Sequence, residues 1–266
     1  MLEQMTLGRY IPGHSWLHRL DPRAKLLLSL YFIILAFLTS NWMTYVLLFV
    51  IVGATIMLTG LSVGYFIRGI GPLIWLIVLT AVLQLLFTPG GTVYWHWGIL
   101  MVTSTGIQLA VAVFLRFLLI ITMATILTLT TAPLALADGV EAMLQPLRVV
   151  HFPVAQTALM LSVALRFVPT LLDEAQTIMN AQRARGVEFN NGGLVKRLHA
   201  IVPLLIPLFV GAIGRADDLA TAMEARGYQG GANRTKYRVL QWHGADTLAV
   251  VVMLMVNVAL IVLRHV

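Results

Sequence analysis

The chain has 266 residues, of which 59% are hydrophobic and 11% are charged, whereas an average soluble protein has about 25% charged residues. This composition excludes an ordinary soluble domain and indicates a polytopic membrane protein. Cysteine is absent, which excludes disulfides, thiolate metal sites and thiol nucleophiles. The formal net charge of +7 is informative through its distribution, because basic residues of membrane proteins gather in cytoplasmic loops.

The chain begins with a basic arm, residues 1–25. This arm has no short apolar core followed by a small-residue cleavage site, so no removable signal peptide is predicted. Asp21 is a good helix cap and Pro22 suits the first helical position. A helix should therefore begin near Pro22, and its apolar part is expected to act as an uncleaved membrane signal.

Long apolar runs follow, and about five of them are expected to cross the membrane. Their approximate bounds are 26–38, 42–58, 69–87, 106–129 and 245–263. A very short turn joins the first two, and residues 60–68 connect the second to the third. The segment after the third, with Pro89-Gly90-Gly91 and several aromatic residues, is interpreted as an interfacial loop.

Residues 131–242 are different, because charges and prolines interrupt their apolar runs and leave no window of about 20 apolar residues. This region is predicted to be helical and amphipathic, and to lie in the cytoplasm. The expected organisation has three parts. They are an N-terminal arm with four transmembrane helices (1–130), the cytoplasmic helical region (131–242) and a last transmembrane helix (243–266).

The distribution of Lys and Arg sets the orientation. The two loops expected outside, 39–41 and 88–105, contain none, and all but Arg116 and Arg264 of the 18 lie in the parts expected inside. The positive-inside rule therefore places the N-terminus in the cytoplasm. With an odd number of spans, the C-terminus is expected outside. No Asp or Glu occurs between Pro22 and Ala137, which disfavours a proton or sodium relay within the membrane.

Several catalytic patterns are absent from the sequence. There is no Gly-Lys-Ser/Thr phosphate loop, no His-Glu-x-x-His and no Gly-x-Ser-x-Gly. The scattered histidines are interpreted as interfacial polar residues rather than metal ligands. No catalytic residue and no metal site is therefore predicted, and the chain is not expected to be an enzyme.

The tripeptide Ala-Arg-Gly occurs twice, as Ala184-Arg185-Gly186 and as Ala225-Arg226-Gly227. Each tripeptide closes a long run with helical hydrophobic spacing, so Gly186 and Gly227 should end two helices and leave the arginines at the tips. An Arg at a helix C-terminus also interacts favourably with the helix dipole. The alternative is that each guanidinium is presented to a carboxylate or carbonyl cluster on a partner, with small neighbours that let the partner close around it.

Charged and small residues line the two arms that carry these tips. Upstream acidic residues could pair with Arg183 and Arg215 and leave the tip arginines free; these are Asp173, Glu174, Asp217, Asp218 and Glu224. Small residues spaced by four favour close helix crossing, although such residues are common in any membrane helix. The residues expected at the crossing are Ala158, Ser162, Ala212, Ala216 and Ala220.

These features together resemble the transmembrane T components of energy-coupling factor (ECF) transporters, in particular those of lactobacilli that serve several vitamin-binding partners. The matching residues are Leu20-Asp21-Pro22-Arg23-Ala24-Lys25, Ala164-Leu165-Arg166-Phe167-Val168-Pro169, Gly214-Arg215-Ala216-Asp217-Asp218-Leu219-Ala220 and the two Ala-Arg-Gly tips. They cover the N-terminus and most of the predicted cytoplasmic region. The remaining spans carry too few distinctive residues to compare.

The resemblance implies a scaffold that couples two ABC-type ATPase subunits, identical or different, to a substrate-binding membrane subunit, the S component. Crossed coupling helices would correspond to about 153–185 and 203–226. Arg185 and Arg226 would each dock in a groove of one ATPase, flanked by Ala184, Gly186, Ala225 and Gly227. ATP and Mg²⁺ would be bound by the ATPases, with no cofactor in this chain.

The apolar upper face of the arms would hold the S component, and the candidates by periodicity are Leu159, Val163, Phe167, Leu204, Leu208 and Phe209. The expected substrate is a vitamin or another micronutrient. Two other functions compete with this one: a self-contained secondary transporter and a membrane-embedded enzyme. The secondary transporter is disfavoured because the chain lacks intramembrane carboxylates and lacks two matched halves with broken helices. The enzyme is disfavoured because no catalytic constellation is present.

Overall fold

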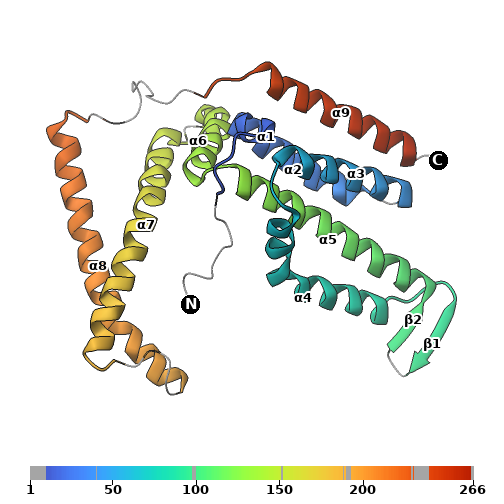
Figure 1. Cartoon of the computed structure of the whole chain (residues 1–266), viewed down its shortest axis with the longest axis horizontal. Helices are drawn as coiled ribbons and strands as arrows, with labels where there is room; N and C mark the ends of the chain where they lie inside the picture. Colours follow the sequence, from blue (N-terminus) through green and yellow to red (C-terminus); the bar gives the residue numbers. More distant parts are fainter. Residues whose placement is uncertain are drawn as a thin grey trace. The chain divides into compact units, whose positions relative to one another are not determined.

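The computed structural model describes residues 10–39, 41–97, 100–150, 152–187, 189, 193–228, 230 and 240–264. The described chain consists of helices and one short hairpin (Figure 1). In order, the elements are α1 (Trp16–Arg19), α2 (Pro22–Leu38), α3 (Trp42–Thr59), α4 (Val63–Phe87), β1 (Val93–Trp97), β2 (Leu100–Thr103), α5 (Ser104–Thr130), α6 (Pro133–Leu144), the 3-10 turn η2 (Gln145–Val150), α7 (Val154–Ala184), α8 (Leu194–Ala225) and α9 (Gly244–Arg264).

The chain divides into two units by its internal contacts. The first, here called the membrane unit, combines Met1–Ala142 with Leu240–Val266, and the second, here called the arm unit, is Met143–Val239. The chain thus leaves the membrane unit within α6 and returns to it shortly before α9. The predicted boundaries at residues 130 and 242 separate membrane-spanning parts from a cytoplasmic part, whereas these two units are defined by internal contacts. The predicted boundaries therefore stay a prediction.

The core of the membrane unit lies where α2, α3, α5 and α9 meet. Helix α5 contacts α2, α3 and α4, and α9 contacts α2 and α3. Buried apolar side chains from each of these four helices form one cluster, which includes Phe32, Leu48, Leu119 and Val256. The outward faces of the same helices remain apolar and exposed, as the bilayer interior requires.

Local signals explain where several helices begin and end. The Asp21 carboxylate accepts a hydrogen bond from the Arg23 amide at 2.8 Å, and Pro22 is the first helical residue, so the predicted start of α2 is confirmed. Gly60 has a φ of +67°, which ends α3. Helix α4 begins at Val63, so the predicted connection 60–68 is wrong and only its first three residues lie outside a helix. A single Arg68 in the first turns does not break the helix, because a long basic side chain can extend from an apolar surface to a polar one.

The aromatic segment after α4 is a two-stranded antiparallel hairpin, not the loop that the sequence suggested. Register pairs such as His96 with Met101 and Trp97 with Leu100 define it. Its β-branched and aromatic residues favour extended backbone, and this preference explains the difference. The predicted outside loop is therefore replaced in part by regular structure.

Six helical stretches are long and apolar enough to cross a membrane by length and composition. They are Trp42–Thr59, Val63–Phe87, Ser104–Thr130, Val154–Ala184, His199–Ala225 and Gly244–Leu263. Four of the five predicted spans lie within them, and the other lies in α2, which at 17 residues is shorter than each of these stretches. Both arms, α7 and α8, also qualify, which their interrupted sequences did not suggest. The chain is an all-α polytopic membrane protein with one small hairpin among its described residues.

Candidate functional site

Helices α7 and α8 form an antiparallel pair within the arm unit. The Gln182 side-chain amide donates to the Pro203 carbonyl at 3.5 Å, and further along α8 the Arg215 guanidinium donates to the Glu174 carboxylate. The contacts run forward along α8 while they run backward along α7, so the two helices point in opposite directions. Figure 1 shows that α8 is bent, and Pro203 and Pro207 inside this helix are the physical cause.

The tip of α7 is a Schellman motif. The Val187 amide donates to the Gln182 carbonyl at 3.0 Å, and the Gly186 amide donates to the Arg183 carbonyl at 3.0 Å. Gly186 has a φ of +87°, a left-handed conformation that glycine adopts most easily. The helix therefore ends at Ala184, with Arg185 as its C-cap.

The tip of α8 repeats the same geometry. The Tyr228 amide donates to the Met223 carbonyl at 3.0 Å, and the Gly227 amide donates to the Glu224 carbonyl at 2.9 Å. Gly227 has a φ of +74°, and Arg226 is the C-cap after Ala225. The prediction that the two glycines end their helices is confirmed at both tips.

The two arginines have nearly the same backbone conformation, with φ and ψ of −85° and 6° at Arg185 and of −88° and 6° at Arg226. Both side chains are exposed, and within the described part of the chain neither guanidinium forms a hydrogen bond or ion pair. A Cβ added at Gly186 or Gly227 would meet no atom within 4 Å, so the space beside each Arg is open. Each tip thus presents a free guanidinium next to an uncovered backbone turn.

The surroundings of the two tips differ in charge. At the first, Arg183 donates to the Asn180 side chain at 3.5 Å and lies over the Phe189 ring, 5.8 Å from its centre. At the second, the last turn carries Glu224 and no basic residue. The last turn of α7 therefore carries a second Arg beside the tip, whereas the last turn of α8 carries a carboxylate.

Besides the bond from Gln182 to Pro203, the arms meet at Glu174 of α7 and at Arg215 and Gly211 of α8. Glu174 and Arg215 form an ion pair, as one of the pairings expected from the sequence, and Arg215 Nε also donates to the Gly211 carbonyl at 3.3 Å. A Cβ at Gly211 would lie 2.9 Å from Glu174 Oε1, so the arms approach closely there. Among the described residues, Arg183 contacts Asn180 and Phe189.

The small residues predicted at the crossing are placed unevenly. Ala158, Ser162 and Ala212 are half-buried, whereas Ala216 and Ala220 are exposed. Their role in the crossing stays a prediction. Gly211 and Gln182 were missed by sequence reasoning, although Gly211 precedes Ala212 in the same stretch of small residues.

The predicted S-component face is also mixed. Leu159, Val163, Phe167, Leu204 and Leu208 are half-buried, and Phe209 is 69% exposed. The most exposed apolar residues of α8 form a stripe next to it, which consists of Leu205, Ile206, Phe209, Val210 and Ile213. The exposed apolar face of α8 is thus rotated relative to most of the residues chosen by helical spacing. Binding of a partner by this face stays a prediction.

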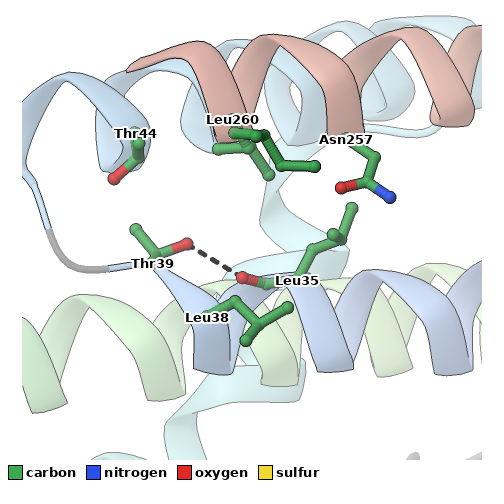
Figure 2. A pocket seen from close by; sticks show the side chains of 7 residues that line it. Leu35, Leu38, Thr39, Thr44, Asn257 and Leu260 are labelled. Carbon is green, nitrogen blue, oxygen red and sulfur yellow. Dashed lines mark hydrogen bonds between the residues drawn. The ribbon is translucent and has the colours of Figure 1, made fainter. Parts of the chain in front are cut away.

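The structure offers little for catalysis or metal binding in its described part. No three His, Asp or Glu side chains come together there as metal ligands do. A hollow between α2, α3 and α9 (Figure 2) holds about 340 Å³ of space, part of it open to the surroundings. Its walls are Leu35, Leu38, Thr39, Thr44, Asn257, Leu260 and Ile261. None of these side chains can act as an acid or a base near neutral pH, and the Thr39 hydroxyl already donates to the Leu35 carbonyl at 2.9 Å.

Arg116, an exception to the expected charge distribution, has a structural explanation. Its Nε donates to the Ala36 carbonyl and its Nη2 to the Thr39 carbonyl, each at 3.1 Å. These carbonyls lie at the C-terminal end of α2, where they lack helical partners. Arg116 thus satisfies a helix end inside the membrane unit and packs over the Phe37 ring at 5.5 Å.

Comparison with known proteins identifies the family of the chain. The family model described as CbiQ, cobalt transport protein, matches residues 13–237. The chain is 56% identical over 263 residues to the energy-coupling factor transporter transmembrane protein EcfT of Lacticaseibacillus paracasei, which covers 99% of this chain and 100% of that protein.

Two further relatives carry the same name. The protein of Listeria innocua is 53% identical over 247 residues, with 93% of each chain covered, and that of Lactococcus lactis subsp. cremoris is 49% identical over 260 residues, with 98% of each covered. The matches extend through the N-terminal arm, the membrane unit and both arms. The chain therefore belongs to the CbiQ family, together with the EcfT transmembrane proteins of energy-coupling factor transporters.

Proposed function

We propose that this chain is the transmembrane scaffold of an ECF-type importer in a bacterial cell membrane, and that it couples ATP hydrolysis by two ABC-type ATPase subunits to the movement of a substrate-binding S component. The observation that carries the proposal is the pair of tips with one geometry. Each has the same Schellman cap, the same Arg conformation and an exposed guanidinium. Two copies of one docking shape suit two related partners.

Each tip would dock in a groove of one ATPase. A Schellman cap fixes the last turn, so little conformational entropy is lost when the Arg binds. A guanidinium fork can bind a carboxylate or clustered carbonyls with directional hydrogen bonds. Ala184 and Gly186 at one tip, and Ala225 and Gly227 at the other, leave room for the groove walls.

The arms would then act as levers that cross at Glu174 and Arg215. The stretch from Pro203, beside Gln182, to Arg226 spans about 35 Å at a rise of about 1.5 Å per residue, so the tips lie far enough apart to engage separate subunits. Closure of the ATPases on ATP would move the tips relative to each other. The crossing would convert that motion into a shift of the apolar face, and the S component bound there would reorient and release its vitamin or other micronutrient.

The remaining roles depend on this arrangement. ATP and Mg²⁺ would be bound by the ATPases, and this chain would be a non-catalytic subunit without its own cofactor. The N-terminus and residues 131–242 would lie in the cytoplasm and the C-terminus outside, in agreement with the distribution of Lys and Arg. The substrate would be chosen by the S component, because the substrate-contacting residues would belong to that chain.

Charge reversal at the tips tests the proposal. The variant Arg185→Glu/Arg226→Glu should lose copurification of both ATPases and lose ATP-dependent uptake, because a carboxylate cannot replace the guanidinium donors. Each single variant should have a milder defect, because the other tip still tethers the complex.

A matched control is Arg183→Glu, which reverses one charge within a turn of the first tip but leaves its Arg in place. This variant should retain the ATPases. Normal assembly and uptake in the double tip variant would refute the proposal, and uptake by the chain alone in vesicles would favour a secondary transporter instead.

A further inference from the structure

Both chain connections between the membrane unit and the arm unit meet the start of α2. On the outgoing side, a Cβ at Gly139 of α6 would lie 2.9 Å from Leu26 Cδ1 and 3.4 Å from Pro22 Cβ, so the backbone of α6 rests directly on α2. On the returning side, Asp246 in the first turn of α9 is fully buried beside the start of α2. The first turn of α2 therefore contacts the chain where it leaves the membrane unit and where it returns.

Asp246 joins two helix starts. Its Oδ1 accepts a hydrogen bond from the Asp21 amide at 2.7 Å, and its Oδ2 accepts one from the His243 amide at 2.8 Å. The first bond holds the residue that caps α2, and the second closes the first turn of α9. A carboxylate can accept from both amides because both of its oxygens carry lone pairs.

Lys25 supplies the opposite charge and two more connections. This residue is 7% exposed, and its ammonium group donates to the Thr130 carbonyl at 3.0 Å and to the His18 carbonyl at 3.3 Å. These carbonyls belong to the last turns of α5 and α1. Burial lowers the pKa of Lys25 to about 8, and the charges of Asp246 and Asp21 act in the opposite direction by favouring its ionised form. Here we call Asp21, Lys25 and Asp246 the α2 junction, which links α1, α2, α5 and α9.

We propose that Lys25 and Asp246 are positioning residues for energy coupling, because the α2 junction holds together the helices of the membrane unit next to which the chain leaves for the arm unit and returns from it. This inference rests on the proposed coupling function. The arms can transmit a movement only if the helices to which they are connected keep their positions. A buried network of charged side chains holds those helices more firmly than exposed loops would. Removing one member leaves the other charge buried without compensation, which is much more costly than losing an exposed pair.

The experiment uses the assembled transporter reconstituted in liposomes, with the variants Asp246→Asn, Lys25→Met and the double variant. Three quantities are measured: copurification of partners, ATP hydrolysis and uptake per ATP hydrolysed. Asp246→Asn should keep assembly and hydrolysis but lower uptake per ATP about tenfold, since the buried Lys25 charge then keeps only Asp21 as a compensating carboxylate. The double variant should recover part of that loss, because the buried ammonium group is removed together with the Asp246 carboxylate. Asp217→Asn, which removes an exposed carboxylate, is the control and should behave as the wild type.

A disulfide variant tests the same inference without removing a charge. Pro22→Cys/Gly139→Cys places two Cβ atoms about 3.4 Å apart, close to the separation of about 3.8 Å that disulfides prefer, and the chain contains no other cysteine. If α6 and the start of α2 keep their contact throughout transport, oxidation should leave uptake per ATP unchanged.

Two results would overturn the inference. One is unchanged uptake per ATP in an assembled Asp246→Asn transporter, and the other is loss of uptake when the disulfide forms. If Asp246→Asn fails to accumulate in the membrane, the disulfide variant decides. Loss of ATPase binding by the tip variants is measured separately, so failure of the proposed function and failure of this inference are distinguishable.

Discussion

The ion pair between Glu174 and Arg215 should determine how firmly the two arms are held at their crossing. Their side chains are 28% exposed for Arg215 and 30% for Glu174, so water screens the pair only in part. Exposed ion pairs contribute about 0.2–1 kcal/mol, whereas breaking a fully buried pair costs about 3–5 kcal/mol. Because this pair lies between the two limits, Glu174→Gln should weaken the crossing by about 1–2 kcal/mol. This corresponds to a change of about 5–30-fold in the equilibrium between the crossed arms and looser states.

Spin labels can measure this change directly, because the chain has no cysteine of its own. Thr177→Cys on α7 and Ala222→Cys on α8 are exposed positions for labelling, and pulsed electron paramagnetic resonance gives the distance distribution between them in the assembled complex. The wild-type pair should give one narrow distribution. Glu174→Gln and Arg215→Gln should each broaden it.

The double variant tests whether the two residues act together. If they form one interaction, Glu174→Gln/Arg215→Gln should broaden the distribution no more than either single change. Asp173→Asn, which alters an exposed neighbour of Glu174, should have no effect. Additive broadening, or none in the single variants, would refute the assignment of this pair to the crossing.

Three further predictions concern the tips, the crossing and the N-terminal arm. Gly186→Ala or Gly227→Ala should each cost about 1 kcal/mol of tip stability, seen as faster amide exchange in the last turn, because each glycine has a positive φ while the space for a Cβ is open. Gly211→Leu should reduce uptake per ATP more than Ala216→Leu does. The reason is that a Cβ at Gly211 would already lie 2.9 Å from the Glu174 carboxylate. Equal defects in the two variants would place the crossing nearer Ala216. Burial lowers the pKa of His18 below its usual 6.5, so the folded state binds fewer protons than the unfolded state just below pH 6.5. Stability should therefore fall as the pH drops through that range, and His18→Gln should flatten this dependence of the unfolding midpoint.

Local sequence signals predicted the helix ends well. Asp21 and Pro22 mark the start of α2, and Gly186 and Gly227 mark the ends of α7 and α8, because each of these residues acts on its own turn of backbone. Hydropathy located the long apolar helices, because it also depends only on residues that are consecutive in the chain. It did not separate the arms from the spans, since α7 and α8 are long and apolar enough to cross a membrane themselves.

Features that depend on how two elements meet were harder to predict. The small residues at Ala212 and Ala216 identify a helix face, but the contact is set by how each helix is rotated, and it is at Gly211 that a Cβ would lie 2.9 Å from the Glu174 carboxylate. The α2 junction could not be predicted either, because Asp21 and Asp246 are separated by most of the chain and come together only through packing. The hairpin of β1 and β2 was not predicted because Pro89-Gly90-Gly91 indicates a turn but does not determine whether the next residues pair as strands.

The most direct test of the central claim asks what touches the tips in a living membrane. A photo-crosslinking amino acid at Ala184 or at Ala225, both exposed beside the tip arginines, can be activated in cells and its products identified by mass spectrometry. The account predicts crosslinks from each position to an ATPase subunit that carries a Gly-Lys-Ser/Thr phosphate loop, and their loss when Arg185 and Arg226 are both changed to Glu. Crosslinks to lipid alone, or to proteins without a nucleotide-binding motif, at both positions would contradict it.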